Sequence, residues 1–387
     1  MSFGFYAYPW NLHDPRSDMA QMQDAGMGHV AVAASYHAGK FLQPRDPRAR
    51  VYFPEDGTIY FQPSARYGKL KPKVSRETLE RDTLAGLCGD GALPVRAWTV
   101  LNHNSRLGWD HPEVTAQNAF GDRYPYSLCP AQPDVIEYAI TLCRDLAANY
   151  DLQQLLLETP GWLTYAHGYH HEFAQAPAHP WLDAMLGLCF CPACRQGAAE
   201  VGINVARLAQ RVRSRIDGHL SGEAPRDLDR DRAEDDDLGA FIQWRCDVVT
   251  GLCRDIVHAV RPGVAVRVIS TCQRPHATAW LEGGDLAALN AACDGLELPI
   301  YQPSVAEARD DLDHVISCVG DATSLSVILR PGFPDMASEA QVAETVAMVL
   351  ERGIGDISFY NYGLLPSADI DRLRRCLKSH APGHAYV

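Results

Sequence analysis

Eight short apolar runs, each followed by a turn and an amphipathic stretch, recur along the whole 387-residue chain. They are rich in Val, Ile, Leu, Phe and Tyr, which is typical of parallel strands buried on both faces. Eight strand–helix repeats favour closure of the sheet, so we expect an α/β fold of the (β/α)8-barrel type. The expected strands are Phe3–Tyr8, His29–Tyr36, Pro94–Leu101, Leu152–Glu158, Val264–Thr271, Gly295–Tyr301, Leu325–Arg330 and Asp356–Tyr360.

Five of the intervening stretches predict helices, because their apolar residues recur with a period near 3.6 or because a capping residue precedes them. The capping candidates are Asp14, Ser75, Ser338 and Ser367. An open doubly wound sheet is the alternative fold, but the turn after the first run reads YPWNLHDP and lacks the glycine-rich phosphate-binding pattern. The expected helices are Pro15–Ala25, Arg76–Leu87, Gln132–Asn149, Glu339–Arg352 and Asp369–Lys378.

Three connections are too long to be simple turns, namely residues 38–74, 102–131 and 159–263. Each follows a strand and precedes a helix, so each is expected to rise from the catalytic face of one barrel domain that spans residues 1–387. The first should contain a hairpin around Asp56-Gly57. The third should contain two long helices joined by an acidic, solvated loop at residues 221–237.

The net charge of −13 comes from 48 acidic and 35 basic residues. A surface this acidic argues against nucleic-acid binding, and no apolar run is long enough to span a membrane. The N-terminus lacks a basic start followed by an apolar core, so we expect no secretory leader. The twelve cysteines are then expected to be reduced thiols or metal ligands in a cytoplasmic protein.

The residues at the ends of the expected strands are rich in aromatic rings and in neutral hydrogen-bonding groups. In a barrel these ends build the active site. Such side chains suit the hydroxyls and ring faces of a sugar, so we expect a small carbohydrate as the bound partner. The alternative is that single aromatics only pack beneath the long loops. The candidate binding residues are Tyr36, His37, Lys40, Asn102, His103, Asn104, Gln273, Tyr301, Arg330, Tyr360 and Asn361.

Glu158 ends the apolar run LQQLLL at the fourth expected strand. A carboxylate at the end of a buried strand is unfavourable unless it is paired or used in chemistry. Burial would raise its pKa, as a general acid near neutral pH requires. The alternative is a structural ion pair, for example with Arg330, but we expect Glu158 to be catalytic.

The loop directly after Glu158 reads TPGWLTYAHGYHHEF and brings His167, His170, His171 and Glu172 near the expected active face. We expect His170 and His171 to bind substrate. Metal binding is the alternative, although the spacing does not match the helical HExxH pattern.

Cys189, Cys191 and Cys194 lie within six residues. Three such thiols can converge on one zinc ion if a fourth ligand, such as Cys129 or a histidine, joins them. A structural zinc is therefore one expectation, and a cluster of reduced buried thiols is the alternative. No other cofactor is expected.

Glycoside hydrolysis usually requires a second carboxyl group across the scissile bond. Glu172 and Asp335 follow expected strands at the correct face and are the catalytic candidates beside Glu158, with Asp110 as a further candidate. Glu297 lies well before the end of its strand, which indicates a salt bridge in the barrel core. Glu172 is preferred because its loop leaves directly from Glu158.

Several motifs together resemble the TIM-barrel glycoside hydrolases and their hydrolase-like relatives. They are SYHAGKF, NAFGDRYPYSLCP, LLLETPGW, HGYHHE with CFCPAC, and FYNYG. The resemblance implies an acid/base glutamate at the end of the fourth strand, which Glu158 matches, and a zinc-binding cysteine loop as in some β-galactosidase-like members. This chain has Leu157 where the group commonly has Asn, and Arg330 where its nucleophile usually ends strand seven.

We therefore expect a glycoside hydrolase for a small glycoside or oligosaccharide, with Glu158 as the general acid/base. Two alternatives stay open, namely a metal-dependent sugar isomerase or epimerase and a non-catalytic carbohydrate-binding barrel. The sequence leaves open whether the chain forms a homo-oligomer.

Overall fold

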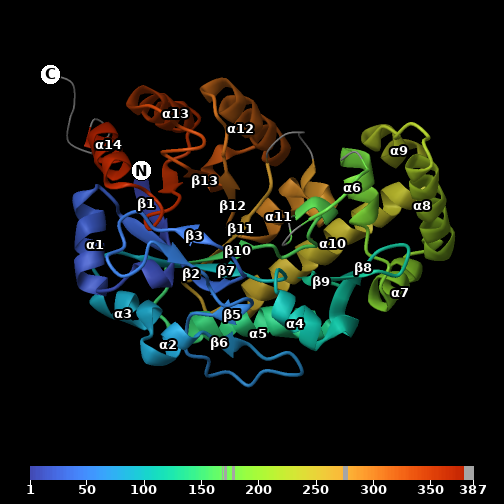
Figure 1. Ribbon diagram of the computed structural model, residues 1–387, viewed down its shortest axis with the longest axis horizontal. Helices are drawn as coiled ribbons and strands as arrows, with labels where there is room; N and C mark the ends of the chain where they lie inside the picture. Colours follow the sequence, from blue (N-terminus) through green and yellow to red (C-terminus); the bar gives the residue numbers. More distant parts are fainter. Residues whose placement is uncertain (168, 170–171, 177–178, 273–277, 379–387) are drawn as a thin grey trace.

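Eight parallel strands close into a barrel in the computed structural model, which describes residues 1–167, 169, 172–176, 179–272 and 278–378 (Figure 1). The ring is complete because β1 pairs with β14 on one side and with β2 on the other. This confirms the expected (β/α)8 TIM barrel. The barrel strands are β1 (Ser2–Ala7), β2 (His29–Tyr36), β7 (Val95–Val100), β10 (Gln154–Glu158), β11 (Ala265–Ile269), β12 (Leu296–Pro299), β13 (Leu325–Leu329) and β14 (Asp356–Phe359).

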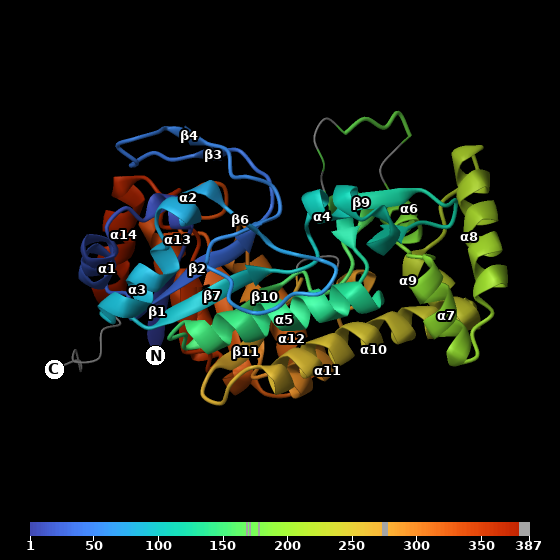
Figure 2. The ribbon, with the colours of Figure 1, turned by 90° about the horizontal axis from the view of Figure 1, so that it is seen from below.

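Helices surround this barrel, and a group of them formed by α6, α7, α8 and α9 stands to one side (Figures 1 and 2). None of the helices in the described ranges is both long and apolar enough to cross a membrane. The helices are α1 (Pro15–Asp24), α2 (Arg76–Glu80), α3 (Thr83–Asp90), α4 (Ser105–Asp110), α5 (Pro133–Asn149), α6 (Pro180–Leu186), α7 (Pro192–Glu200), α8 (Val205–Leu220), α9 (Leu228–Glu234), α10 (Asp236–Ala259), α11 (Leu286–Ala292), α12 (Val305–Val319), α13 (Glu339–Glu351) and α14 (Ser367–Lys378).

Helix capping agrees with the sequence at three positions and differs elsewhere. The side chains of Asp14, Ser75 and Ser338 accept hydrogen bonds from the first turns of α1, α2 and α13. Ser367 instead lies inside α14. The single helix predicted from Arg76 to Leu87 is wrong, because Asp82 caps a new helix by accepting a hydrogen bond from the Ala85 amide.

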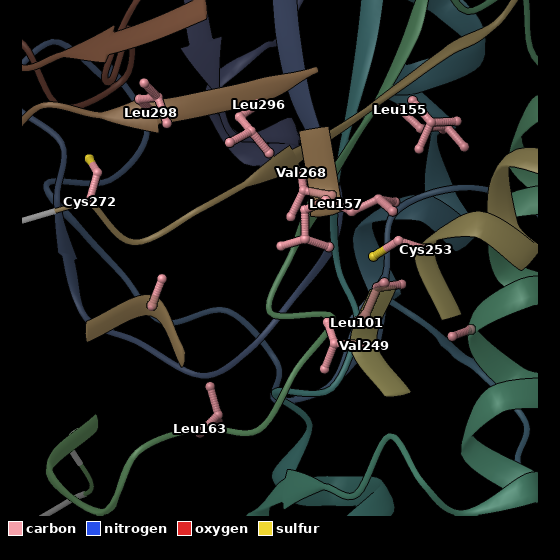
Figure 3. Close-up of a cluster of buried hydrophobic side chains, with 14 of the residues drawn as sticks. Leu101, Leu155, Leu157, Leu163, Val249, Cys253, Val268, Cys272, Leu296 and Leu298 are labelled. Atoms are coloured by element: carbon pink, nitrogen blue, oxygen red, sulfur yellow. The ribbon is translucent and has the colours of Figure 1, made fainter. Parts of the chain in front are cut away.

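Alternation along β10 decides which side chains face the barrel interior. Leu155 and Leu157 point outward and join the core between the strands and α10 (Figure 3). Leu156 belongs instead to the aromatic cluster inside the barrel. Because successive strand residues face opposite sides, Glu158 is directed inward at the C-terminal end of the barrel.

Glu297 lies inside the barrel near the start of β12 and is fully buried. It accepts hydrogen bonds from the Tyr6 hydroxyl at 2.9 Å and from the Ser326 hydroxyl at 2.8 Å. Arg96 forms an ion pair with Asp356 instead, at 3.0 Å. Glu297 therefore belongs to the core, as expected, but hydroxyl groups rather than the predicted salt bridge hold it.

The first insertion covers the barrel end, but the predicted hairpin around Asp56-Gly57 is wrong. β4 (Val51–Tyr52) pairs with β3 (Phe41–Leu42), whereas β5 (Thr58–Ile59) pairs with β2 and with β6 (Lys73–Val74). The two aromatic runs thus pair with other partners, since tertiary contacts outweigh the local turn.

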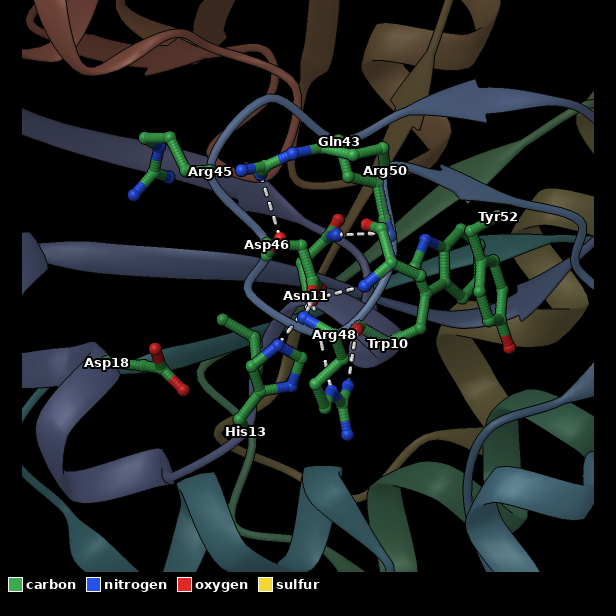
Figure 4. A network of polar contacts seen from close by, with 12 residues as sticks. Trp10, Asn11, His13, Asp18, Gln43, Arg45, Asp46, Arg48, Arg50 and Tyr52 are labelled. Carbon is green, nitrogen blue, oxygen red and sulfur yellow. Dashed lines mark hydrogen bonds and ion pairs between the residues drawn. The ribbon is translucent and has the colours of Figure 1, made fainter.

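A polar network fastens this insertion to the segment after β1 (Figure 4). Asn11 donates to the Gln43 side chain at 2.5 Å, and the His13 ring lies 2.9 Å from Asp46. Arg48 donates to the backbone oxygen of Trp10 at 3.2 Å. These hydrogen bonds fix the first insertion to the rim of the barrel.

The acidic segment at residues 221–237 is not a plain solvated loop, because it contains α9. Asp231 of this helix is buried and accepts a hydrogen bond from the Trp181 indole at 3.0 Å. Arg226 and Arg215 bind the same carboxylate at 2.6 and 3.3 Å. These partners turn a charge-rich sequence into an ordered element that packs against α6.

Candidate active site

Glu158 borders a pocket of about 170 Å³ at the C-terminal end of the barrel. Residues that follow β10 line one side of this pocket, and residues of β11 and the segment after it line the other. The Trp98 indole N–H donates a hydrogen bond to the Glu158 carboxylate. Burial raises the pKa of Glu158 to about 7, and the Trp98 hydrogen bond opposes this rise. The group can thus hold a proton at neutral pH.

Aromatic hydroxyls border the interior side of Glu158. The Tyr8 hydroxyl lies 3.0 Å from that of Tyr36 and also contacts that of Tyr360. The Glu158 charge raises the pKa of Tyr36, Tyr360 and Tyr301, in addition to the larger effect of burial. Three of the predicted binding residues therefore surround the carboxylate as neutral hydroxyls.

Arg330 and Asp335 form a pair rather than two independent groups. Arg330 donates to both oxygens of Asp335, at 2.5 and 2.8 Å, and its guanidinium stacks on the Tyr301 ring at 4.2 Å. The ion pair that the sequence left open between Glu158 and Arg330 is replaced by this one. A bidentate partner neutralises Asp335 and holds Arg330 in one orientation.

Three histidines contact one another near the barrel mouth, with His37 stacked on His103 and His167 edge-on to His103. The rings of His37 and His103 lie 4.0 Å apart, and the Nε2 atom of His167 lies 3.2 Å from Nδ1 of His103. Burial, together with the charges of His37 and His167, lowers the pKa of His103 to about 2. A neutral imidazole can donate a hydrogen bond to one hydroxyl group and accept a hydrogen bond from another.

Other predicted binding residues have structural partners or lie elsewhere. Asn102 is buried and donates to the Pro160 oxygen at 2.6 Å, whereas Asn104 caps α4. The Asn361 oxygen accepts from the Gly363 amide at 3.0 Å. Lys40 and Glu172 are exposed. His170, His171 and Gln273 lie outside the described residues.

Glu282 shares the pocket with Glu158 and is the carboxylate that the sequence analysis missed. It ends η4 (Thr278–Glu282) and accepts a hydrogen bond from the Thr271 hydroxyl at 2.9 Å. Burial raises its pKa to about 7, Thr271 opposes this rise, and the Glu158 charge adds to it. The sequence offers little to find it, because Glu282 lies well beyond the end of β11 and belongs to no periodic pattern.

Three buried polar atoms in the pocket wall have no hydrogen-bond partner among the described residues. They are Oγ1 of Thr159, Nε1 of Trp162 and Oγ of Ser270. Thr159 also has a φ of 52°, which a β-branched residue rarely adopts. Unpaired polar atoms and backbone strain are common where a protein binds a polar ligand.

The two sides of the pocket are joined by close backbone contact. The Trp162 amide donates to the Glu282 oxygen at 3.0 Å, and a Cβ atom at Gly161 would overlap that same oxygen. Glycine at position 161 thus lets the loop after Glu158 approach Glu282.

Gly161→Ala is expected to lower the free energy of unfolding by about 1–3 kcal/mol, because the added methyl group must displace backbone. Urea unfolding of the two proteins measures this difference. Gly251→Ala in α10 is the matched control, since its Cβ meets nothing within 4 Å and alanine favours a helix interior. Equal stability of Gly161→Ala and wild type would contradict the proposed close approach.

The described part of the chain contains one group of three or more His, Cys, Asp or Glu residues whose donor atoms converge. It consists of Cys129, Cys189, Cys191 and Cys194, all buried. The Cys129 sulfur lies 3.4 Å from Cys194, 3.6 Å from Cys191 and 3.9 Å from Cys189. Four sulfurs bound to zinc at ~2.3 Å form a tetrahedron with edges of about 3.8 Å, so the four residues fit this ion.

Arg245 lies buried beside this cysteine group. Its guanidinium donates to the Leu281 oxygen at 2.8 Å and stacks on the Trp162 ring at 4.6 Å. Its Nε and Nη1 atoms have no hydrogen-bond partner within the described ranges. Burial lowers the pKa of Arg245, and negative charge on Cys189 and Cys194 raises it. A buried cation in this place favours thiolates over neutral thiols.

Comparison with known proteins identifies the fold. No family model and no curated protein matches the sequence. The glycoside hydrolase domain of PgaB (BpsB) from Bordetella bronchiseptica superposes with a TM-score of 0.60 at 14% identity, over 97% of this chain and 98% of that one. The α-L-fucosidase isoenzyme 2 from Paenibacillus thiaminolyticus gives 0.53 at 13% identity, over 94% of this chain and 46% of that one. This chain shares the TIM-barrel fold of these glycoside hydrolases.

Proposed function

We propose that this protein is a glycoside hydrolase that acts on a small glycoside or oligosaccharide, with Glu158 as the general acid. The observation that carries the proposal is a carboxyl group at the barrel mouth whose pKa of about 7 allows it to be protonated at neutral pH. The two similar structures are glycoside hydrolases, which supports the same class of reaction for this chain. Because the sequence identities are only 14% and 13%, this support comes from the shared fold alone.

The residues near Glu158 suit a neutral, polyhydroxylated substrate. Tyr36, Tyr301 and Tyr360 present hydroxyls and ring faces, and His37 and His103 present neutral imidazoles. Arg330 is already paired with Asp335, so its charge is compensated. This pairing favours a neutral sugar over the acidic one that a free arginine would bind.

A panel of 4-nitrophenyl and 2,4-dinitrophenyl glycosides tests the function directly. Release of nitrophenol by wild-type protein, retained after treatment with a chelator, supports a glycosidase. If sugars bind without any release, the chain is a carbohydrate-binding barrel. If instead a free aldose is isomerised and the chelator abolishes this activity, the chain is a metal-dependent isomerase.

The hydrolysis of a 4-nitrophenyl glycoside is expected to decline as the pH rises through about 7, because Glu158 then loses the proton it must donate. An unperturbed glutamate would already lose its proton near pH 4.5. The profile of kcat/KM from pH 4 to pH 10 measures this alkaline limb. A rate that stays constant to pH 9 would contradict Glu158 as the acid.

We also propose that Cys129, Cys189, Cys191 and Cys194 bind a structural zinc ion. Their sulfur separations fit a closed tetrahedral site, and Arg245 supplies a buried positive charge next to the thiolates. The ion would join the segment after β9 (Arg123–Leu128) to the start of α7. All twelve cysteines lie in the described ranges and none forms a disulfide, which supports a reducing, cytoplasmic location.

A further inference from the structure

We infer that Glu282 is the second catalytic carboxylate, acting as the general base that activates the attacking water. The inference rests on the proposed glycosidase function and assigns the partner of Glu158. The clearest support is placement, since both carboxyl groups line one pocket at the C-terminal end of the barrel. They enter it from neighbouring strands, because Glu158 ends β10 and Glu282 lies in the segment that follows β11.

Backbone contact keeps the two groups together. The loop after Glu158 donates a hydrogen bond from the Trp162 amide to the backbone oxygen of Glu282, at 3.0 Å. Gly161 lies against the same oxygen. The charge of Glu158 is close enough to raise the pKa of Glu282. The fold therefore holds the backbone of Glu282 against the loop that follows Glu158.

The other carboxyl groups at this face are less suited to the role. Asp335 is buried, and both of its carboxylate oxygens accept hydrogen bonds from Arg330. Glu172 is exposed. Glu282, in contrast, accepts a hydrogen bond from the neutral Thr271 hydroxyl. It borders the pocket in which three polar atoms lack a partner within the described ranges. Its carboxylate can take up a proton without breaking an ion pair.

The pocket that both carboxyl groups line suits a base rather than a nucleophile, because its volume of about 170 Å³ leaves room for a water beside Glu282. A nucleophile functions best as a stable carboxylate, whereas a general base functions best when its pKa lies near the working pH. Burial and Glu158 raise the pKa of Glu282 to about 7, while Thr271 and Arg245 lower it and Asp183 adds a smaller rise. The charges of the two carboxylates repel each other, so the pair holds one proton, and the form that is active in hydrolysis has this proton on Glu158 and the charge on Glu282.

Hydrolysis proceeds as a single displacement at the anomeric carbon. Glu158 donates its proton to the glycosidic oxygen while the bond from this oxygen to the anomeric carbon breaks. A water oxygen forms the new bond to that carbon, and Glu282 accepts the proton that the water loses. The products are an alcohol and a free sugar of inverted configuration, with Glu158 ionised and Glu282 protonated until a proton returns to Glu158.

Glycosides with good and poor leaving groups separate the two carboxyl groups. Glu282→Gln should lose at least about 100-fold in kcat with both 2,4-dinitrophenyl and 4-nitrophenyl glycosides, because water must be activated in either case. Glu158→Gln should lose far less with 2,4-dinitrophenyl, which leaves without a proton. Azide should restore release by Glu282→Ala, since azide can form the bond to the anomeric carbon without a base. Glu344→Gln, an exposed carboxyl on α13, is the matched control and should match wild type.

The outcomes distinguish the inference from the function on which it rests. If Glu282→Gln keeps its activity while Glu158→Gln loses it, the inference is overturned and the function stands. If wild type cleaves no glycoside in the panel, both fail. A product of retained configuration, measured by NMR during hydrolysis, overturns the role of Glu282 as base.

Thr271→Val provides the test if Glu282→Gln does not fold. Loss of this hydroxyl removes a hydrogen bond that lowers the pKa of Glu282, so the acidic limb of the kcat/KM profile should move to higher pH. A merely structural role of Thr271 would lower stability without moving this limb. An unmoved acidic limb in an active Thr271→Val variant would count against Glu282 as the base.

Discussion

Glu158→Gln is expected to lower kcat/KM for a 4-nitrophenyl glycoside by about 10²–10⁴-fold, the usual contribution of a positioned acid or base. Glutamine keeps the size of the side chain and can still accept the hydrogen bond from the Trp98 indole. It has no proton to give to the leaving oxygen. The loss should increase as the leaving group becomes more basic, and the alkaline limb near pH 7 should disappear from any residual activity.

A stability measurement shows whether the Glu158→Gln protein is intact and tests the same pKa. Folded Glu158 holds its proton up to about pH 7, whereas an unfolded glutamate loses it near pH 4.5. The unfolded wild type binds fewer protons in this window, so its stability decreases as the pH rises. Glu158→Gln should therefore be more stable than wild type at pH 8, by up to about 3 kcal/mol, and the difference should vanish near pH 4. A destabilised variant at pH 8 would show that Glu158 is a structural residue.

Cys191→Ser is expected to remove bound zinc and to lower the free energy of unfolding by about 3 kcal/mol or more. Zinc bound by thiolates contributes directly to folding, and the cysteines are distant in sequence, with Cys129 before α5 and the other three around the start of α7. Without the ion, the thiolates lose the charge that holds them together. Metal analysis of the purified protein should give one zinc per chain, and thermal unfolding with and without a chelator should show the loss.

Cys318→Ser is the control for this experiment, because Cys318 is exposed and lies outside the cysteine group. It should leave both the zinc content and the melting temperature unchanged. Substitution by cobalt should give the visible absorption of a tetrahedral thiolate complex. Protein purified without zinc, whose melting temperature neither zinc nor a chelator alters, would show that the four residues are reduced thiols packed in the core.

Arg245 links the cysteine group to the pocket that contains Glu158 and Glu282. Its guanidinium lies beside the cysteine group, stacks on Trp162 and also lowers the pKa of Glu282. Loss of the metal is thus expected to disturb the pocket wall as well as the insertion. Activity and metal content should be measured on the same samples, so that a loss of turnover in Cys191→Ser is not taken for a direct catalytic role.

The sequence by itself determined the barrel and one catalytic candidate. Each strand is defined by its own short apolar run, so all eight could be located within two residues at each end. Glu158 could be found because a single charge ended one of these buried runs. Cys189, Cys191 and Cys194 could be found because their spacing is local.

Only the tertiary structure decided which distant groups meet. It placed Cys129 rather than a histidine beside the three clustered cysteines, paired Arg330 with Asp335, and brought Glu282 to the pocket of Glu158. It also paired β4 and β5 with partners other than each other. Periodicity records how a segment meets its own neighbours along the chain. Contacts between separate loops depend on the closure of the barrel, and a single sequence carries no local pattern for them.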